Sequence, residues 1–216
     1  SITKWLGNGS SGHTIPHNLG AVPQVVIMKN RDNAITWIVG HKSAAFTNIL
    51  FLDTNAAAAD DANAFADTDP TSTVWTMGTG NGGNDNDVNY VGYIFAPKQG
   101  FSKFGSYTGN ANANGTFVYT GFSPSFVMAK MTSGTGNWNT FDNKRTDSGG
   151  GNVIDKRIKN NSNAAEIDGT ANQVNFLSNG FKWRGTDDDT NVSGGTFIYM
   201  AFAESPFVNS EGVPTN

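Results

Sequence analysis

An internal repeat is the feature of this sequence that most constrains its fold. The segment His17–Lys29 can be placed over Val118–Lys130 at a shift of 101 positions. Without a gap, the same shift carries Trp37 onto Trp138. The other identical pairs are Gly20 with Gly121, Pro23 with Pro124, Val26 with Val127 and Lys29 with Lys130. Glycine, proline and tryptophan in the same order are what a shared backbone requires, so we predict two copies of one domain.

A second block supports the repeat and locates an insertion. Val91–Ala96 matches Ile198–Ala203 at a shift of 107, which also pairs Asn84 with Asn191. The second copy therefore gains six residues in its middle, where surface loops tolerate insertion. We predict one copy over residues 1–100 and the other over residues 101–216.

Short β-branched and aromatic runs between Gly, Asn, Asp and Pro predict strands rather than helices. The fold class that we predict is all-β, with two similar antiparallel β-sandwiches of the jelly-roll or lectin-like type. The last run of each copy is apolar on nearly every residue and should be covered on both faces. Asn179-Gly180 predicts a hairpin. Asn55–Asp67 is the one helix candidate, with a long loop as the alternative.

Composition excludes several classes of function. Only 15% of the residues are charged and the net charge is −4, which does not favour nucleic acid as a partner. The chain has no cysteine, so neither disulfides nor thiolate metal sites can form. No apolar run approaches the ~18 residues of a membrane span, so we expect no membrane insertion. The sequence starts without Met, so we expect a processed form or a segment of a longer chain, and the sequence does not decide between them.

The sequence contains no recognisable catalytic constellation, and we predict that the protein is not an enzyme. Its three histidines have no metal-ligand spacing, and only three glutamates are present. The aspartates lie mostly in Gly/Asn-rich turns, where carboxylates usually cap backbone amides. A polysaccharide depolymerase is the weakest alternative, since no residue can be named as its acid or base.

Two Asp-rich loops occupy the same place in the two copies, before the last strand. They span Gly78–Asn89 and Gly185–Gly195. Calcium is the one candidate cofactor, because it prefers six to eight oxygen ligands. The alternative is a solvated connection. The candidate ligands are Asp85, Asp87, Asp187, Asp188 and Asp189.

Sugar binding would use aromatic rings beside polar side chains. Trp37 and Trp138 occupy matching strand positions and are expected in the core. Trp75 and Trp183 fall on adjacent rather than equivalent positions under the 107 shift, so we expect at least one to face solvent. The matched lysines Lys29 and Lys130 are further candidates for an acidic glycan or a neighbouring subunit, with a solvated strand end as the alternative.

Nearly the whole sequence resembles a known family, although the resemblance is weaker in the first half. The segment GFSKFGSYTGNANANGTFVYTGFSPSFVMAK, then GNWNTFDNKR, FLSNGFK and SGGTFIYMAFAESPFVNSEGVPTN, resembles the duplicated domain of tail-fibre-like and other virion-associated proteins of marine bacteriophages. The resemblance is strongest from Gly100 onward. It implies a β-rich structural or adhesive role and carries over no catalytic residues.

We therefore expect a non-enzymatic component of a virion surface or extracellular fibre, acting through multivalent assembly and surface binding. The expected partners are copies of the same chain, other virion or fibre subunits, or a host-surface glycan. The alternative is a free carbohydrate-binding module or lectin.

Overall fold

The computed structural model describes residues 1–80, 82–146 and 152–205. The chain divides into two compact units, Ser1–Ala96 (unit 1) and Pro97–Asn216 (unit 2). Each unit encloses its own cluster of buried apolar side chains. The units are therefore described one at a time.

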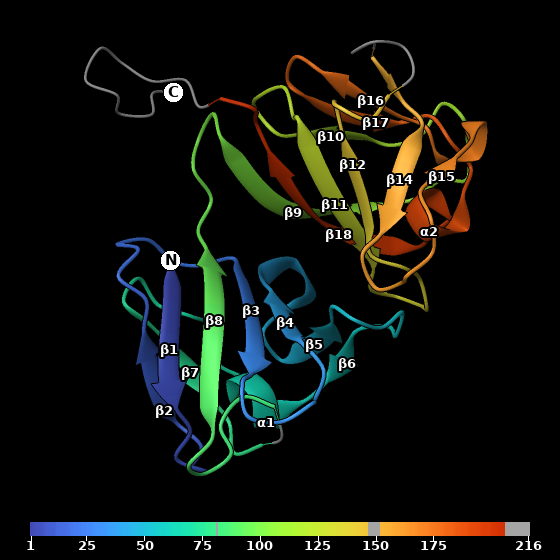
Figure 1. Ribbon diagram of the computed structural model, residues 1–216. Coiled ribbons are helices and arrows are strands. Elements are labelled where there is room, and N and C mark those ends of the chain that lie inside the picture. Colours follow the sequence, from blue (N-terminus) through green and yellow to red (C-terminus); the bar gives the residue numbers. More distant parts are fainter. Residues whose placement is uncertain (81, 147–151, 206–216) are drawn as a thin grey trace, which may run out of the picture. The chain divides into compact units, whose positions relative to one another are not determined.

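Unit 1 is a β-sandwich of a six-stranded and a two-stranded antiparallel sheet (Figure 1). The larger sheet has the order β1-β8-β3-β4-β5-β6, and the smaller sheet pairs β2 with β7. A 3₁₀ turn, η1, and a one-turn helix, α1, connect strands. The bounds are β1 Ile2–Leu6, β2 His13–Pro16, β3 Val25–Asn30, β4 Ile38–His41, η1 Lys42–Ala44, β5 Asn48–Phe51, β6 Ala59–Asp60, α1 Ala62–Phe65, β7 Val74–Met77 and β8 Asn89–Phe95.

Unit 2 repeats this plan with a wider second sheet. Its sheets have the orders β15-β14-β12-β11-β18-β9 and β10-β17-β16-β13. The bounds are β9 Ser102–Thr108, β10 Phe117–Tyr119, β11 Phe126–Met131, β12 Asn139–Asp142, β13 Val153–Ile154, β14 Lys156–Lys159, β15 Ile167–Asp168, η2 Thr170–Asn172, β16 Val174–Leu177, β17 Gly180–Trp183, α2 Asp188–Asn191 and β18 Thr196–Phe202. The predicted all-β class with two antiparallel sandwiches is confirmed.

The central strands of the two units pair in the same register. Lys29 of β3 lies opposite Val91 of β8, and Lys130 of β11 lies opposite Ile198 of β18. The shifts of 101 and 107 found in the sequence convert the first pair into the second. A one-residue slip would move every side chain to the other face of the sheet, so agreement of register means that matching positions face the same layer.

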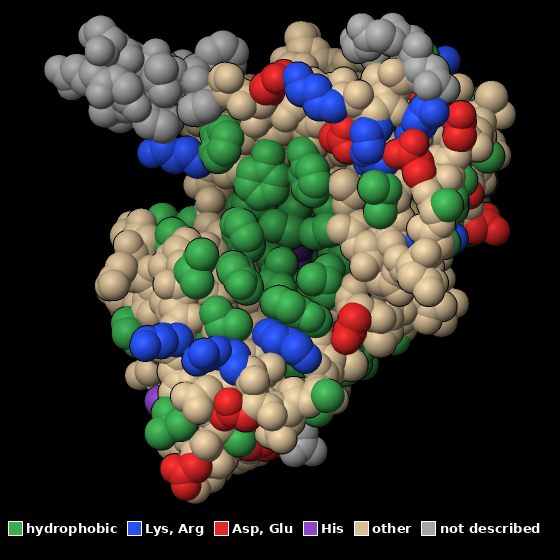
Figure 2. Space-filling model, in the orientation of Figure 1, with side chains coloured by type: hydrophobic (Ala, Val, Ile, Leu, Met, Phe, Trp, Pro, Cys, Tyr) green, Lys and Arg blue, Asp and Glu red, His purple; other side chains and the backbone are tan. Residues whose placement is uncertain are grey.

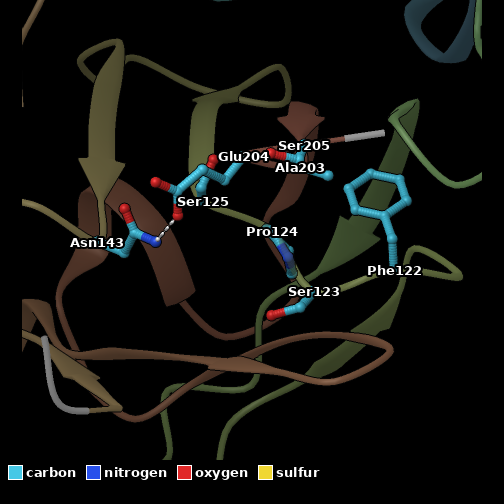
Figure 3. Close-up of a pocket in the computed structure, with 8 residues that line it drawn as sticks. All are labelled: Phe122, Ser123, Pro124, Ser125, Asn143, Ala203, Glu204 and Ser205. Carbon is cyan, nitrogen blue, oxygen red and sulfur yellow. Dashed lines mark hydrogen bonds between the residues drawn. The ribbon is translucent and has the colours of Figure 1, made fainter. Parts of the chain in front are cut away.

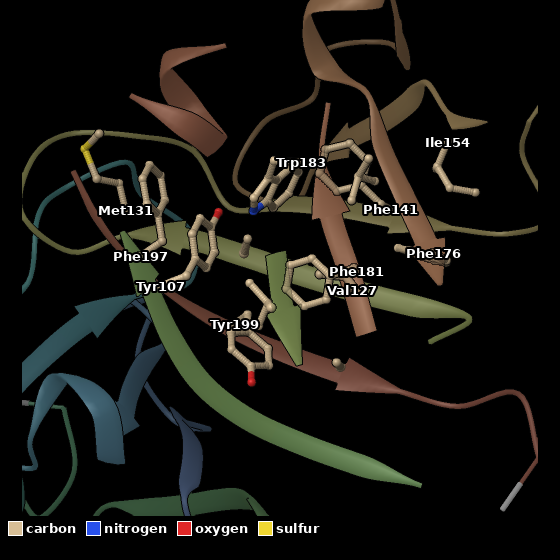
Figure 4. Packing of buried hydrophobic residues seen from close by; sticks show 14 of the residues in the cluster. Tyr107, Val127, Met131, Phe141, Ile154, Phe176, Phe181, Trp183, Phe197 and Tyr199 are labelled. Atoms are coloured by element: carbon tan, nitrogen blue, oxygen red, sulfur yellow. The ribbon is translucent and has the colours of Figure 1, made fainter. Parts of the chain in front are cut away.

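Aromatic rings fill both cores. In unit 1 the Trp5 ring stacks on Tyr90 at a centroid distance of 5.4 Å and meets Trp75 edge-on at 5.5 Å. In unit 2 Tyr107 stacks on Phe197 at 4.9 Å and lies beside Trp183 (Figure 4). Burial of such large side chains is the main favourable contribution to folding.

Three local predictions needed correction. Only Ala62–Phe65 of the helix candidate is helical, capped by Asp61, because the alanine run before it has no amphipathic face and its Ala59–Asp60 pairs with β5. The last strand is buried on almost every residue in β18, but only on alternate residues in β8. Strands β1 and β9 were not predicted, since neither shows a long β-branched run.

Candidate functional site

The two tryptophans predicted as sugar-stacking residues lie in the cores. Trp75 and Trp183 are both 0% exposed, so the expectation that at least one faces solvent was wrong. The reason is one additional residue in unit 2: Met77 directly precedes Gly78, whereas Arg184 separates Trp183 from Gly185. Trp183 therefore takes the inward position of Met77 rather than that of Thr76.

The matched lysines have different environments. Lys29 is partly exposed, donates to the backbone oxygen of Ile35, and has its ammonium 6.0 Å from the centroid of the Trp37 ring. Lys130 is 0% exposed, and its Nζ donates to the carbonyl oxygen of Met131 at 2.6 Å. Burial lowers the pKa of Lys130 to about 8, partly offset by the Asp189 carboxylate. A buried Lys130 does not present its charge to a glycan.

In unit 2 the predicted calcium loop is occupied by internal ion pairs. Asp187 accepts two hydrogen bonds from the buried guanidinium of Arg157, at 2.7 and 3.0 Å. Asp189 accepts from Asn137 at 2.8 and 3.0 Å and lies 3.2 Å from Lys159 Nζ. Burial would raise the pKa of Asp189, but these hydrogen bonds outweigh it and lower the pKa. Asp188 is exposed in the first turn of α2.

In unit 1 the corresponding aspartates are also engaged locally. Asp85 Oδ2 accepts from the Tyr90 hydroxyl at 2.9 Å, and exposed Asp87 accepts from Asn86 at 2.7 Å. Residue 81 of this loop lies outside the described residues. No group of three or more His, Cys, Asp or Glu side chains suited to a metal occurs among the residues that the structure describes.

We therefore expect calcium to have little effect on stability. A cation in the unit 2 loop would have to displace Arg157 and Lys159 from Asp187 and Asp189, which costs the charge-assisted hydrogen bonds already made. Thermal unfolding with millimolar calcium and then with excess chelator should give the same midpoint. A calcium-dependent rise of several degrees, abolished by Asp87→Asn or Asp188→Asn, would restore the calcium hypothesis.

The two loops share an asparagine whose side chain connects three segments of the chain by hydrogen bonds. In unit 1, buried Asn84 donates through Nδ2 to Asn8 Oδ1, Ser10 O and Gly78 O, at 3.1, 2.8 and 2.8 Å. Its Oδ1 accepts from the backbone amide of Asn8 at 3.1 Å. The Asn84 side chain thus closes the loop against the segment that follows β1.

Asn191 makes the same set of bonds in unit 2. Its Nδ2 donates to Asn110 Oδ1, Asn112 O and Gly185 O, and its Oδ1 accepts from the amide of Asn110 at 3.0 Å. We call Asn84 and Asn191 the asparagine nodes. A Cβ on Gly109 would lie 2.3 Å from the backbone oxygen of Val192. The two backbone segments are therefore too close for any residue with a side chain at position 109.

A shallow pocket lies beside the end of β18 (Figure 3). Its Glu204 accepts from Lys144 at 2.5 Å and from Asn143 at 3.3 Å, and these hydrogen bonds lower its pKa. Acidic and basic side chains are intermingled on the face of unit 2 that carries β12, β14 and β15 (Figure 2). The pocket carboxylate is therefore neutralised locally. The lining residues are Phe122, Ser123, Pro124, Ser125, Asn143, Ala203, Glu204 and Ser205.

The outer face of the four-stranded sheet in unit 2 carries exposed aromatic rings. Val118, Phe176 and Phe181 point into the core, so alternate residues of β10, β16 and β17 point outward. The side chains of Phe117 and Tyr119 are 42% and 58% exposed. We call this surface the aromatic face; it comprises Phe117, Tyr119, Asn175, Leu177, Gly180 and Lys182, with Lys103 and Arg184 at its margin.

The backbone and a lysine hold the two rings in place. A Cβ on Gly180 would lie 3.0 Å from Phe117 Cε2, so the Phe117 ring lies close against β17. Lys103 donates to the Tyr119 carbonyl oxygen at 2.8 Å, and its ammonium lies 5.0 Å from the centroid of the Tyr119 ring. Rings fixed in this way lose little entropy when a ligand binds.

Comparison with known proteins assigns the chain to a family. The model of a domain of unknown function, DUF7483, matches residues 1–206. The chain belongs to this family. No curated protein and no solved structure matches it. In this DUF7483 domain, the described residues include no helix that is long and apolar enough to cross a membrane.

Sequence reasoning did not identify the aromatic face. Phe117 and Tyr119 alternate with Val118 in TFVYT, but alternation does not reveal which of its two faces is buried. The repeat pairs Asn191 with Asn84, but only the tertiary contacts show that each is a buried hydrogen-bonding centre. The repeat was the signal that marked both positions.

Proposed function

We propose that this DUF7483 domain is a non-enzymatic structural and adhesive module of a virion surface or other extracellular assembly, of tail-fibre or surface-fibre type. The observation that carries the proposal is the exposure of large apolar side chains on edge strands of both units. Soluble monomers usually protect their sheet edges and keep apolar side chains there sparse, because such edges pair with other chains.

Strand β1 is one edge of the six-stranded sheet in unit 1. It pairs with β8 on one side only, and its Ile2 and Leu6 side chains are 70% and 52% exposed. The charged Lys4 stands between them on the same face. In unit 2 the edge strand β10 exposes Phe117 and Tyr119. Both surfaces are suited to contacts with other chains or with a solid surface.

The carboxylates support a non-enzymatic role. A general acid in glycoside hydrolysis needs a raised pKa, so that it is protonated near neutral pH. Hydrogen bonds from Asn89 lower the pKa of Asp32, and those from Lys144 and Asn143 lower the pKa of Glu204. Together with Asp189, these are the described carboxylates with a resolved shift, and all three favour the ionised form.

Assembly in many copies would give such a module its strength. Weak contacts add to firm attachment when they are linked, because later contacts form at a high effective concentration. The resemblance of residues 100–216 to virion-associated proteins supports a homo-oligomer or an array with other fibre subunits. Either arrangement would use the exposed β1 strand as a subunit contact.

Light scattering on the purified protein, followed by negative-stain imaging, tests this proposal. We expect a discrete oligomer or an extended filament, and Leu6→Lys should weaken the association at least tenfold by placing a second charge beside Lys4. Val22→Lys is the matched control, since Val22 is exposed to a similar extent, 48%, but lies in a loop and not on an edge strand. A protein that stays monomeric at high concentration would overturn assembly through β1.

A free carbohydrate-binding module is the second candidate, and the aromatic face favours it. Fixed, exposed rings beside lysine, arginine and asparagine are the side chains that sugar sites use. A stable monomer that binds a polysaccharide would identify the protein as this second type.

A further inference from the structure

We propose that the aromatic face binds an acidic polysaccharide, with Phe117 and Tyr119 stacking on sugar rings and Lys182 and Arg184 pairing with their carboxylates. This inference deepens the adhesive function and rests on it. It assigns binding to the outer sheet surface of unit 2 and not to the buried tryptophans.

The spacing of the two rings suits a polymer rather than a single sugar. Phe117 and Tyr119 are two residues apart on one strand, so their side chains leave the same face about 7 Å apart. A sheet face with two rings on alternate residues of one strand can contact neighbouring sugars of one polysaccharide chain. Apolar ring faces pack against the C–H groups of sugars, and the surrounding polar groups bind hydroxyls.

The charges around the rings indicate the kind of polysaccharide. Lys182 and Arg184 make no ion pair among the described residues, and Lys103 lies beside Tyr119. The outward residues of β10, β16 and β17 include no Asp or Glu. A cationic surface without carboxylates complements uronic acids, and unpaired cations need not be released from protein partners first.

Asn175 supplies the remaining polar group. It lies opposite Lys182 in the β16–β17 pair, is half-buried, and its side chain makes no hydrogen bond within the described part of the chain. The buried Asn175 Oδ1 is the atom without a partner among the described residues, and a sugar hydroxyl is a suitable donor to it. The face thus combines stacking, ionic and neutral hydrogen-bonding groups.

Unit 1 provides a natural comparison, because it lacks these groups at the same place. The strand pair β2–β7 corresponds to β10–β17, and its outward side chains are Thr14, Pro16, Val74 and Thr76. These residues carry neither an aromatic ring nor a charge. Substitutions at Thr14 and Pro16 are therefore matched controls for Phe117 and Tyr119.

Single-stranded nucleic acid also stacks on aromatic rings beside cations, but it fits this protein less well. Proteins that bind it usually have a basic groove that follows the phosphates. Unit 2 has ten basic and ten acidic residues, and unit 1 is net acidic. The overall field would therefore not attract a polyanion as dense as DNA, whereas a local contact with uronates needs only the face.

Calorimetric titration with polygalacturonate oligomers, neutral dextran oligomers and oligo(dT) tests the proposal. We expect binding to polygalacturonate, with Phe117→Ala and Tyr119→Ala each weakening it at least tenfold. Lys182→Gln should weaken binding and reduce its dependence on salt, because one ionic contact is lost. Thr14→Ala and Pro16→Ala should change nothing, and melting curves of all variants check that they fold.

Three outcomes would overturn the inference. They are no polygalacturonate binding at millimolar ligand, tighter binding of oligo(dT), and unchanged affinity in both aromatic variants. If Phe117→Ala instead dissociates the oligomer without affecting polygalacturonate, the face is a subunit contact. Failure of glycan binding in a protein whose assembly still depends on Leu6 would leave the proposed function standing and remove this inference alone.

Discussion

Asn191→Asp should lower the free energy of unfolding of unit 2 by about 3 kcal/mol, and Asn84→Asp should do the same to unit 1. The substitution keeps the size of the side chain and its acceptor oxygen but removes the NH₂ group, whose two N–H donors are shared among three acceptor oxygens in each unit. It also places a negative charge against backbone carbonyl oxygens. Because both asparagines are 0% exposed, water cannot replace the lost partners.

Urea unfolding followed by tryptophan fluorescence measures both effects, because each core contains tryptophan. Asn112→Asp is the control in unit 2 and Asn86→Asp in unit 1, since both asparagines are exposed. These variants should change stability by less than about 0.5 kcal/mol. A loss below 1 kcal/mol in both node variants would show that the nodes are dispensable.

Lys130→Met should stabilise unit 2 at pH 7 by about 2 kcal/mol and remove a rise in stability between pH 8 and pH 10. The pKa of Lys130 is about 8 in the folded chain, against 10.5 as its ordinary value. Between these pH values the unfolded chain binds more protons than the folded one, so raising the pH favours folding. Methionine has no charge to bury and fills a similar volume.

Tyrosines limit the pH range in which this effect can be seen. Burial raises the pKa of Tyr90 and Tyr199 to about 12, above the ordinary value of 10. Above pH 10 the unfolded chain loses these phenolic protons first, so stability falls as the pH rises. The unfolding free energies of the native chain and of Lys130→Met, measured at pH 7, 8, 9 and 10, should differ most at pH 7. They should converge toward pH 10, because the buried Lys130 of the native chain is then neutral.

Lys29→Met is the matched control for Lys130→Met. Lys29 holds the same register position but is partly exposed and has its ammonium near the Trp37 ring. Its replacement removes that contact and no buried charge, so stability at pH 7 should stay the same or fall slightly. A Lys130→Met variant less stable than the native chain at pH 7 would mean that the hydrogen bond to Met131 outweighs the cost of burying the charge.

The sequence by itself determined the fold class and the duplication. Short apolar runs between turn-forming residues specify strands locally, and Gly20, Pro23 and Trp37 recur in order as Gly121, Pro124 and Trp138 because one backbone path needs them twice. The sequence did not predict strands β1 and β9, because such short segments show neither a clear helical nor a clear strand periodicity. Only the structure shows that the two strands are equivalent, which aligns Trp5-x-Gly7-Asn8 with Tyr107-x-Gly109-Asn110.

The tertiary structure decided which side chains are buried and which are available to a partner. The additional residue Arg184 shifts the inward and outward alternation of β17 by one position, so Trp183 points into the core. The pairing of β10 with β17 places Phe117 and Tyr119 on the outer face of the sheet. Asp187 and Asp189 form ion pairs with Arg157 and Lys159 because the fold places β14 beside their loop. Local patterns fix the alternation of a strand, but its register against distant strands fixes which face meets solvent.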